Sequence, residues 1–167
     1  FALLAKYCIR FSIKFNKKFI FAFKRPPGDE NYDAEQNLYK KFLTFNEYKY
    51  LRKRSKFKKN KDKFGSYKTM RESKVVVGTM STMLRENIAL GGKTLTCNTT
   101  GNEIYNFPIK GKFFIKCQTY YEFEKNILNL LNLSDKKYQK YANSKMLISN
   151  FNTSEIVEKE LKNLINS

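Results

Sequence analysis

The stretch from residue 74 to residue 111 constrains the fold most, because it alternates short apolar runs with polar turns. Residues 75–77 are three valines with no polar residue between them, which is typical of a parallel strand covered on both faces. Gly78 and Thr79 follow at once and interrupt the apolar run. We therefore expect a buried strand that ends in a turn at these two residues.

A helix is expected directly after this turn. Ser81 and Thr82 precede apolar residues at helical spacing, and two glycines stop the pattern before a second strand at residues 93–98. The backbone amides at Ser81 and Thr82 would then point out of the carboxyl end of a parallel sheet. Free amides at a helix N-terminus favour an anion such as a phosphate. An ordinary helix cap is the competing interpretation of the same two residues.

The rest of the chain alternates strands and helices in the same way, without two-residue hairpin turns. This pattern favours an α/β fold with a Rossmann-like, mostly parallel sheet and helices on both faces. Residues 47–51 fit either a short strand or a helical turn. Leu38, Phe42 and Leu43 are expected to form the apolar side of the second helix. We expect helices at residues 3–15, 33–44, 66–73, 119–133, 135–144 and 154–165, and further strands at 19–23 and 113–116.

The charge of the chain is strongly positive and unevenly distributed. The formal net charge is +18, and residues 1–74 carry 21 Lys or Arg against 7 Asp or Glu. Residues 75–167 carry 12 basic residues against 8 acidic ones. Such a basic half suits a polyanionic partner, whether nucleic acid, phospholipid headgroups or a phosphorylated substrate. A genome of low GC content would also enrich lysine, so compositional bias is a competing explanation for part of the excess.

The stretch from Lys49 to Lys63 is the most basic segment and the least globular in composition. It holds nine basic residues and one acidic residue, with aromatic residues between them. One interpretation is a nucleic-acid-binding or ribosome-associated protein, since such a segment can follow phosphates and stack on bases. Another is peripheral contact with an anionic membrane. The second interpretation predicts that salt-sensitive liposome binding is lost when four lysines are neutralised, namely Lys56, Lys58, Lys59 and Lys61.

Length and cysteine usage limit the class further. The 167 residues, 41% of them hydrophobic, suffice for one domain with a core. Cys8, Cys97 and Cys117 are widely spaced and the chain has no histidine, which argues against a zinc site and a disulfide framework. We expect buried free thiols in a reducing compartment. No apolar run is long enough for a spanning helix. Because the chain begins with Phe1, we expect a fragment whose natural start lies upstream.

Four segments together resemble a known family. They are FAFKRPP at residues 21–27, GSYKTMRESKVVVGTMSTMLRENIALGGKTLTCN at 65–98, YNFPIKG at 105–111 and TYYEFEKNILNLLNLSDKKY at 119–138. In this order they resemble the C-terminal half of GT-B glycosyltransferases, and most closely bacterial proteins of O-antigen and surface-carbohydrate biosynthesis. The resemblance implies a nucleotide-sugar-binding domain over residues 1–167, with a nucleotide-sugar as co-substrate and no metal or other cofactor. It also implies an N-terminal acceptor domain that this chain lacks.

The resemblance assigns donor-binding roles to several residues. Ser81 and Thr82 match the hydroxyl pair that meets the donor diphosphate, and Glu86 matches an acidic position that contacts the donor ribose. The spacing agrees, because Glu86 lies about one helical turn after the expected amides. The turn residues Gly78 and Thr79 belong to the same donor site.

Three more residues complete this expected site. Lys24 matches a basic position that neutralises the leaving diphosphate, and Ser66 and Tyr67 match a Ser-Tyr pair near the cleft. Lys24 would reach the edge at Ser81 if its strand runs parallel to the valine strand in one sheet. The chain departs from the family at Asn87, where alanine is usual, which puts the packing of that helix in question.

The resemblance supplies no catalytic residue, since the base of such enzymes comes from the other half. The chain alone is therefore expected to bind a donor without transferring sugar, in the cytoplasm or at the inner face of the cell membrane. No specific nucleic acid is expected on this interpretation. Phe107 and Pro108 fit the family's FP turn, and a rigid turn packed on the core explains them equally well. A half-enzyme that is inert without its partner domain stays open as a third interpretation.

Overall fold

The structure is a computed structural model that describes residues 2–23, 25, 27–57 and 65–142. Lys24 and the helix expected at residues 154–165 lie outside the described residues, as does much of the segment from Lys49 to Lys63. The described elements are, in chain order, α1 (Ala2–Lys14), β1 (Phe21–Phe23), α2 (Tyr32–Phe42), α3 (Phe45–Lys53), β2 (Ser55–Phe57), α4 (Gly65–Arg71), β3 (Val76–Gly78), α5 (Thr82–Ala89), β4 (Thr94–Asn98), η1 (Glu103–Tyr105), β5 (Phe114–Lys116), α6 (Tyr120–Asn132) and α7 (Asp135–Ala142).

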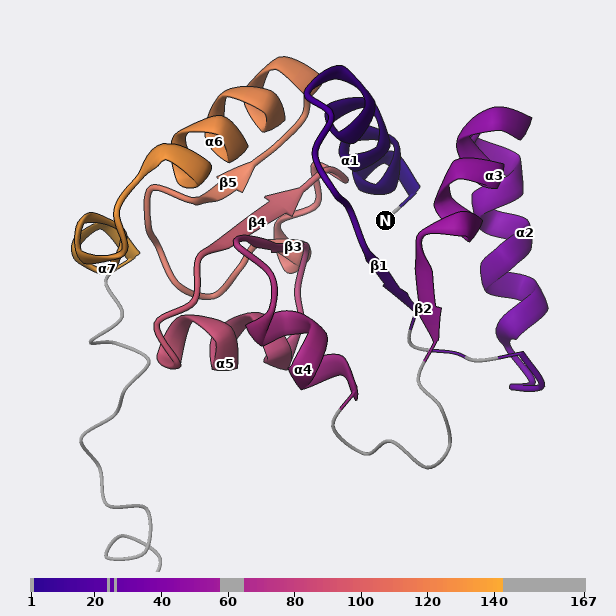
Figure 1. Cartoon of the computed structure of the whole chain (residues 1–167), viewed down its shortest axis with the longest axis horizontal. Helices are drawn as coiled ribbons and strands as arrows, with labels where there is room; N and C mark the ends of the chain where they lie inside the picture. Colours follow the sequence, from indigo (N-terminus) through magenta and orange to yellow (C-terminus); the bar gives the residue numbers. More distant parts are fainter. Residues whose placement is uncertain (1, 24, 26, 58–64, 143–167) are drawn as a thin grey trace, which may run out of the picture.

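Strands β3, β4 and β5 form a parallel sheet in that order, with β4 in the centre. Figure 1 shows α1 and α6 along one side of this sheet and α4 and α5 along the other. The fold is therefore α/β with a small parallel sheet between helices, as the sequence predicts. The prediction that the valine strand is the covered one is wrong. All five residues of β4 are buried, whereas β3 is half-buried because it lies at the edge of the sheet.

Strands β1 and β2 form a separate parallel pair, in which Phe21 is in register with Ser55. The chain between them folds into α2 and α3. This arrangement corrects the expectation that the first strand shares a sheet with the valine strand. Its partner is β2 instead, so the parallel sheet does not bring the end of β1 to the edge where β3 ends.

The core has two parts, and α1 contributes to both. Leu4, Cys8 and Phe11 of α1 pack with residues of β4, α5 and α6 in the larger cluster. Ala5 and Ile9 of the same helix pack in the smaller cluster with residues of β1, α2 and α3. Two adjacent sides of one helix thus connect the three-stranded sheet to the β1–β2 pair. This explains why α1 has apolar residues over most of its circumference.

Helix α2 corrects a second expectation. Leu43 is buried, as predicted, but Leu38 and Phe42 are 42% and 55% exposed, and the buried residues of the helix are Gln36 and Tyr39. The Tyr39 ring lies edge-on to Phe21 and Phe23 of β1, at 5.4 and 5.5 Å between centroids. This aromatic contact sets the rotation of the helix and turns Leu38 and Phe42 outward.

Several boundaries follow local sequence signals. The ambiguous residues 47–51 belong to α3, which begins at a capping box formed by Thr44 and Glu47. The same kind of box, Thr119 with Glu122, begins α6 where the sequence predicts. All three cysteines are free and buried, as expected. Among the described residues, no helix is both long and apolar enough to cross a membrane.

Candidate functional site

Three parallel strands end along one edge of the sheet. Gly78 ends β3, Asn98 ends β4 and Lys116 ends β5. Asn98 is in register with Lys116, whereas Gly78 is in register with Thr96, so β4 extends two residues past the end of β3. The residues that follow each strand therefore line the carboxyl edge, which is where open α/β sheets bind ligands. The expected Gly78–Thr82 turn lies at this edge.

Helix α5 begins at this edge with Ser81 as its N-cap. The Ser81 Oγ accepts a hydrogen bond from the N–H of Met83 at 3.3 Å, and the Ser81 carbonyl accepts one from the N–H of Leu84 at 3.1 Å. Ser81 and Thr82 are exposed, and within the described part of the chain their own N–H groups have no hydrogen-bond partner. The capping interpretation is thus confirmed, and it coexists with two free amides that can donate to an anion.

Gly78 and Thr79 form the floor of the turn. A Cβ on Gly78 would lie 3.0 Å from Cδ1 of the buried Leu84, so glycine allows α5 to approach β3 closely. The Thr79 side chain is 5% exposed, and its Oγ1 is buried without a hydrogen-bond partner among the described residues. Gly78 therefore has a packing role, and the Thr79 hydroxyl lies near the start of α5 in the sequence without a hydrogen-bond partner among the described residues.

Glu86 and Tyr67, both expected in the site, lie together. The hydroxyl of Tyr67 on α4 forms a hydrogen bond with the carboxylate of Glu86 on α5, and this bond raises the pKa of Tyr67 above its ordinary value. The Oε2 atom of Glu86 is buried and has no partner among the described residues. Ser66 precedes Tyr67 on α4 and is half-buried. Oε2 of Glu86 is therefore a buried acceptor without a hydrogen-bond donor among the described residues.

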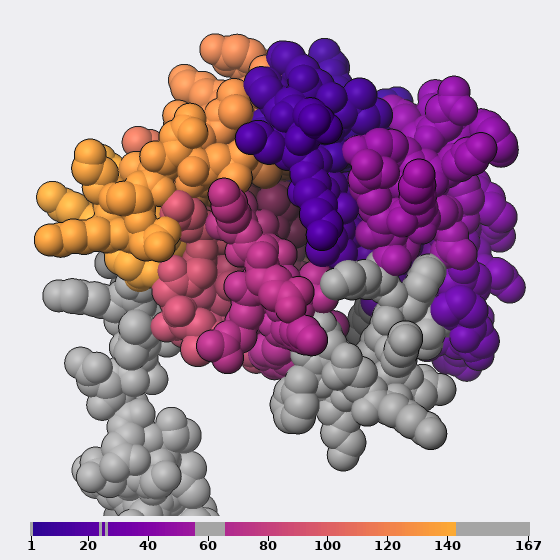
Figure 2. Space-filling view, viewed as in Figure 1, coloured from indigo at the N-terminus to yellow at the C-terminus, as the bar shows by residue number. Residues whose placement is uncertain are grey.

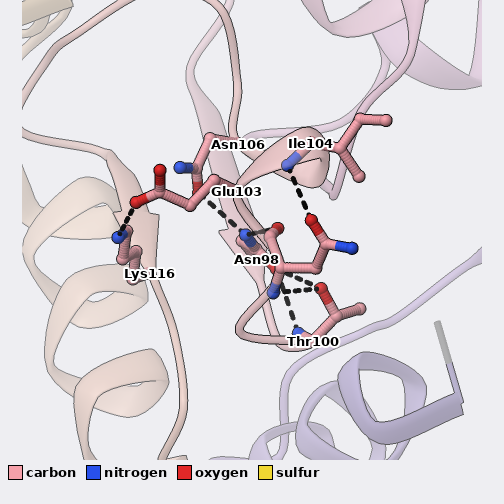
Figure 3. Close-up of polar contacts among 7 residues, drawn as sticks. Asn98, Thr100, Glu103, Ile104, Asn106 and Lys116 are labelled. Atoms are coloured by element: carbon pink, nitrogen blue, oxygen red, sulfur yellow. Dashed lines mark hydrogen bonds and ion pairs between the residues drawn. The ribbon is translucent and has the colours of Figure 1, made fainter.

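Asn98 organises the loop that follows β4, as Figure 3 shows. Its side chain is 3% exposed and donates to the Asn102 carbonyl at 2.8 Å and to Asn106 Oδ1 at 2.7 Å. Its Oδ1 accepts from the N–H and the hydroxyl of Thr100, at 3.0 and 2.8 Å. These bonds hold the loop in one shape at the carboxyl edge. Sequence reasoning missed Asn98, although a polar residue at the end of an apolar strand was the available signal.

Lys116 is a further residue that sequence reasoning missed. It ends β5, and its Nζ lies 2.8 Å from Glu103 Oε1 of η1 (Figure 3). This contact lowers the pKa of the Glu103 carboxyl. Both side chains are more than half exposed, so the pair is open to competition by another anion. Lys116 supplies a cation at the carboxyl edge, whereas the position of Lys24 lies outside the described residues.

Two residues singled out in the sequence have structural roles. Asn87 is buried and donates to the Lys93 carbonyl at 3.2 Å and to Thr94 Oγ1 at 2.8 Å. These two hydrogen bonds connect α5 to the start of β4. Phe107 packs on Phe114 at 4.9 Å between ring centroids and belongs to the rim of the larger core. The FP turn is therefore explained by packing.

Two surface hollows lie away from this edge. One, of about 550 Å³, follows α1 and is lined by Leu3, Ile9 and Ile13 among others. The other, of about 450 Å³, lies between the end of α6 and α7 and is lined by Lys112, Lys140 and neighbouring residues. None of the expected donor-site residues that the structure describes lines either hollow. Within the described residues there is also no cluster of histidine, cysteine or carboxylate side chains that could hold a metal ion.

Comparison of the chain with protein-family models, curated proteins and solved structures found no match in any of the three. The function must therefore be inferred from the chemistry of the carboxyl edge and from the motifs in the sequence.

Proposed function

We propose that this chain binds a nucleotide-sugar at the carboxyl edge of its parallel sheet, as the donor-binding half of a GT-B glycosyltransferase in bacterial surface-polysaccharide biosynthesis. The observation that carries the proposal is the start of α5. Ser81 and Thr82 are exposed there, with their backbone N–H groups unpaired among the described residues, at the end of a parallel strand. Two such amides at a helix N-terminus suit one phosphate group of a diphosphate.

The other edge residues fit the remaining parts of such a donor. Oε2 of Glu86 would accept a hydrogen bond from a ribose hydroxyl, because it has no hydrogen-bond donor among the described residues. The Lys116 ammonium would leave its exposed ion pair with Glu103 and bind the second phosphate instead. Together these groups would stabilise the negative charge that develops on a leaving diphosphate.

The chain would supply donor binding and no catalytic base. Transfer would need a second domain that places the acceptor and takes its proton. The partners of this half are therefore a nucleotide-sugar and an acceptor-binding domain. A basic nucleic-acid-binding protein is the alternative function, and it predicts binding through lysines outside the carboxyl edge.

Calorimetric titration with UDP, CDP, GDP and their sugars tests the proposal. Binding of one nucleotide is expected, and Glu86→Ala is expected to weaken it by roughly tenfold through loss of a charged hydrogen bond. Ser81→Ala also removes a helix cap, so Ser134→Ala is its matched control, since Ser134 Oγ accepts from the N–H of Lys137 at the start of α7. Absence of binding for all three nucleotides would refute the proposal, as would equal binding by the wild type and the Ser81→Ala/Glu86→Ala variant.

A further inference from the structure

The outward side of α2 is apolar while its inward side holds a polar residue. Leu38 and Phe42, one helical turn apart, are 42% and 55% exposed. Gln36 is 2% exposed, and its Oε1 accepts hydrogen bonds from the Tyr48 hydroxyl at 3.0 Å and from Arg52 Nη1 at 3.3 Å. Gln36 thus has hydrogen-bond partners at Oε1, while its Nε2 is buried without a partner among the described residues. The exposed apolar strip has no structural explanation within the described residues. Such a strip marks an interaction surface.

Phe45 extends this strip around the connection between α2 and α3. It is 80% exposed, more than any other large apolar residue that the structure describes. Its position is fixed, because the capping box of Thr44 and Glu47 begins α3 at this residue and Leu43 just before it is buried. Phe42 and Phe45 therefore flank an anchored residue at the same end of the helix pair. In Figure 2, the purple α2 and α3 form the right-hand border of the molecule.

Positive charge surrounds the end of the α2–α3 pair that carries Phe42 and Phe45, which we call the tip. Lys40, Lys41 and Lys49 are all exposed, and the sequence has no acidic residue between positions 36 and 46. The next carboxylate in the sequence, Glu47, is engaged in the capping box and lies 3.8 Å from Lys6. The acidic residues of α2 lie in its first turn, at the opposite end of the helix. The tip thus combines exposed apolar side chains with exposed lysines.

We propose that this tip, formed by Leu38, Phe42 and Phe45 with Lys41 and Lys49, docks on an anionic membrane surface. Phenylalanine rings enter the boundary between headgroups and acyl chains, while Lys41, next to Phe42, and Lys49, one turn after Phe45, reach the lipid phosphates. A second copy of the chain is disfavoured as the occupant, because a symmetric contact would bring two sets of lysines together. The surface is distinct from the donor edge and does not depend on the proposed function.

A single tryptophan reporter tests the docking directly, because the chain has no tryptophan. Phe45→Trp in the full chain is expected to show blue-shifted emission and quenching by brominated acyl chains. This should occur with vesicles that contain phosphatidylglycerol and not with phosphatidylcholine alone. Tyr121→Trp is the matched control, since Tyr121 is 72% exposed at the start of α6, which begins with the same kind of capping box. The control is expected to stay unquenched.

Vesicle sedimentation with phosphatidylglycerol vesicles gives the second measurement. Phe42→Ser/Phe45→Ser is expected to reduce partitioning by roughly tenfold or more, while Tyr121→Ser leaves it unchanged. Both phenylalanines are exposed, so the double variant should keep its fold, which circular dichroism checks. The proposal is overturned if the double variant partitions like the wild type, which would indicate binding through other lysines alone. It is also overturned if Phe45→Trp shifts with protein concentration in the absence of lipid, which would indicate self-association or a protein partner.

Discussion

The hydroxyl of Tyr67 on α4 forms a hydrogen bond with the carboxylate of Glu86 on α5. The two residues are 19 positions apart in the sequence and lie on neighbouring helices. Oε2 of Glu86 is buried without a partner among the described residues. The carboxylate at the candidate site therefore interacts with a residue outside its own helix.

This pair makes a titration prediction. The hydrogen bond to Glu86 raises the pKa of Tyr67, so replacing the carboxylate by an amide should lower that pKa toward the ordinary value of tyrosine. Tyrosine Cζ chemical shifts in ¹³C-labelled protein report the titration, and Tyr67→Phe identifies the resonance. An identical Tyr67 titration in wild type and Glu86→Gln would show that the two side chains do not interact in solution.

Gly78 is predicted to be required for packing. Gly78→Ala places a methyl group 3.0 Å from Leu84 Cδ1 and should lower the free energy of unfolding by about 1–3 kcal/mol through overpacking. Urea denaturation measures the loss. Leu84→Ala makes room for the added methyl group, so its combination with Gly78→Ala should be less destabilising than the sum of the single changes. Additive effects would contradict a direct clash.

The Thr119–Glu122 capping box should stabilise α6 in a pH-dependent manner. Thr119→Ala is expected to cost about 1 kcal/mol of unfolding free energy, because the N–H of Glu122 loses its acceptor. The backbone N–H of Thr119 lowers the pKa of the Glu122 carboxyl from 4.5. A lowered pKa stabilises the folded state above pH 4.5 and loses this effect as the pH falls through the folded-state pKa.

Chemical denaturation between pH 7 and pH 3 separates the two parts of the box. Glu122→Gln should weaken the acid-induced loss of stability, since the amide does not titrate in this range. Thr119→Ala should lower stability at both pH values. A wild type and a Glu122→Gln variant with parallel pH profiles would contradict the assigned role of the carboxylate.

Asn98 is predicted to determine the order of the loop after β4. Asn98→Ala removes four side-chain hydrogen bonds, to Asn102, Asn106 and twice to Thr100. Because the side chain is buried, the expected loss is about 1–3 kcal/mol, with faster amide hydrogen exchange at Thr100. Asn106→Ala removes one of these bonds and should have a smaller effect. Unchanged exchange at Thr100 in Asn98→Ala would rule out this role.

The parts of the fold that sequence predicts well have strong local signals. The Thr119 cap and the apolar spacing after it predict α6, and the valine run predicts β3, because both patterns depend on neighbouring residues. The start of α5 at Ser81 is likewise determined by its own turn. The sequence therefore predicts the place of the free amides in the candidate site.

The remaining features depend on contacts between distant segments. The valines are at a sheet edge because β4 takes the centre, which no local pattern of β3 can indicate. Leu38 and Phe42 turn outward because Tyr39 packs on β1, a tertiary contact that overrides apolar spacing in α2. Asn98 and Lys116 belong to the candidate site because β4 and β5 are neighbours in the sheet, and sequence spacing alone does not predict that order.

The central claim is that a nucleotide diphosphate binds at the start of α5, and backbone amide chemical shifts in ¹⁵N-labelled protein test it most directly. Titration with UDP, CDP or GDP should shift the amide resonances of Ser81 and Thr82 most, with smaller shifts at Asn98 and Lys116. The Ser81→Ala/Glu86→Ala variant should lose these shifts. Shifts confined to exposed lysines of α2 and α3, or no shifts with any of the three nucleotides, would contradict the claim.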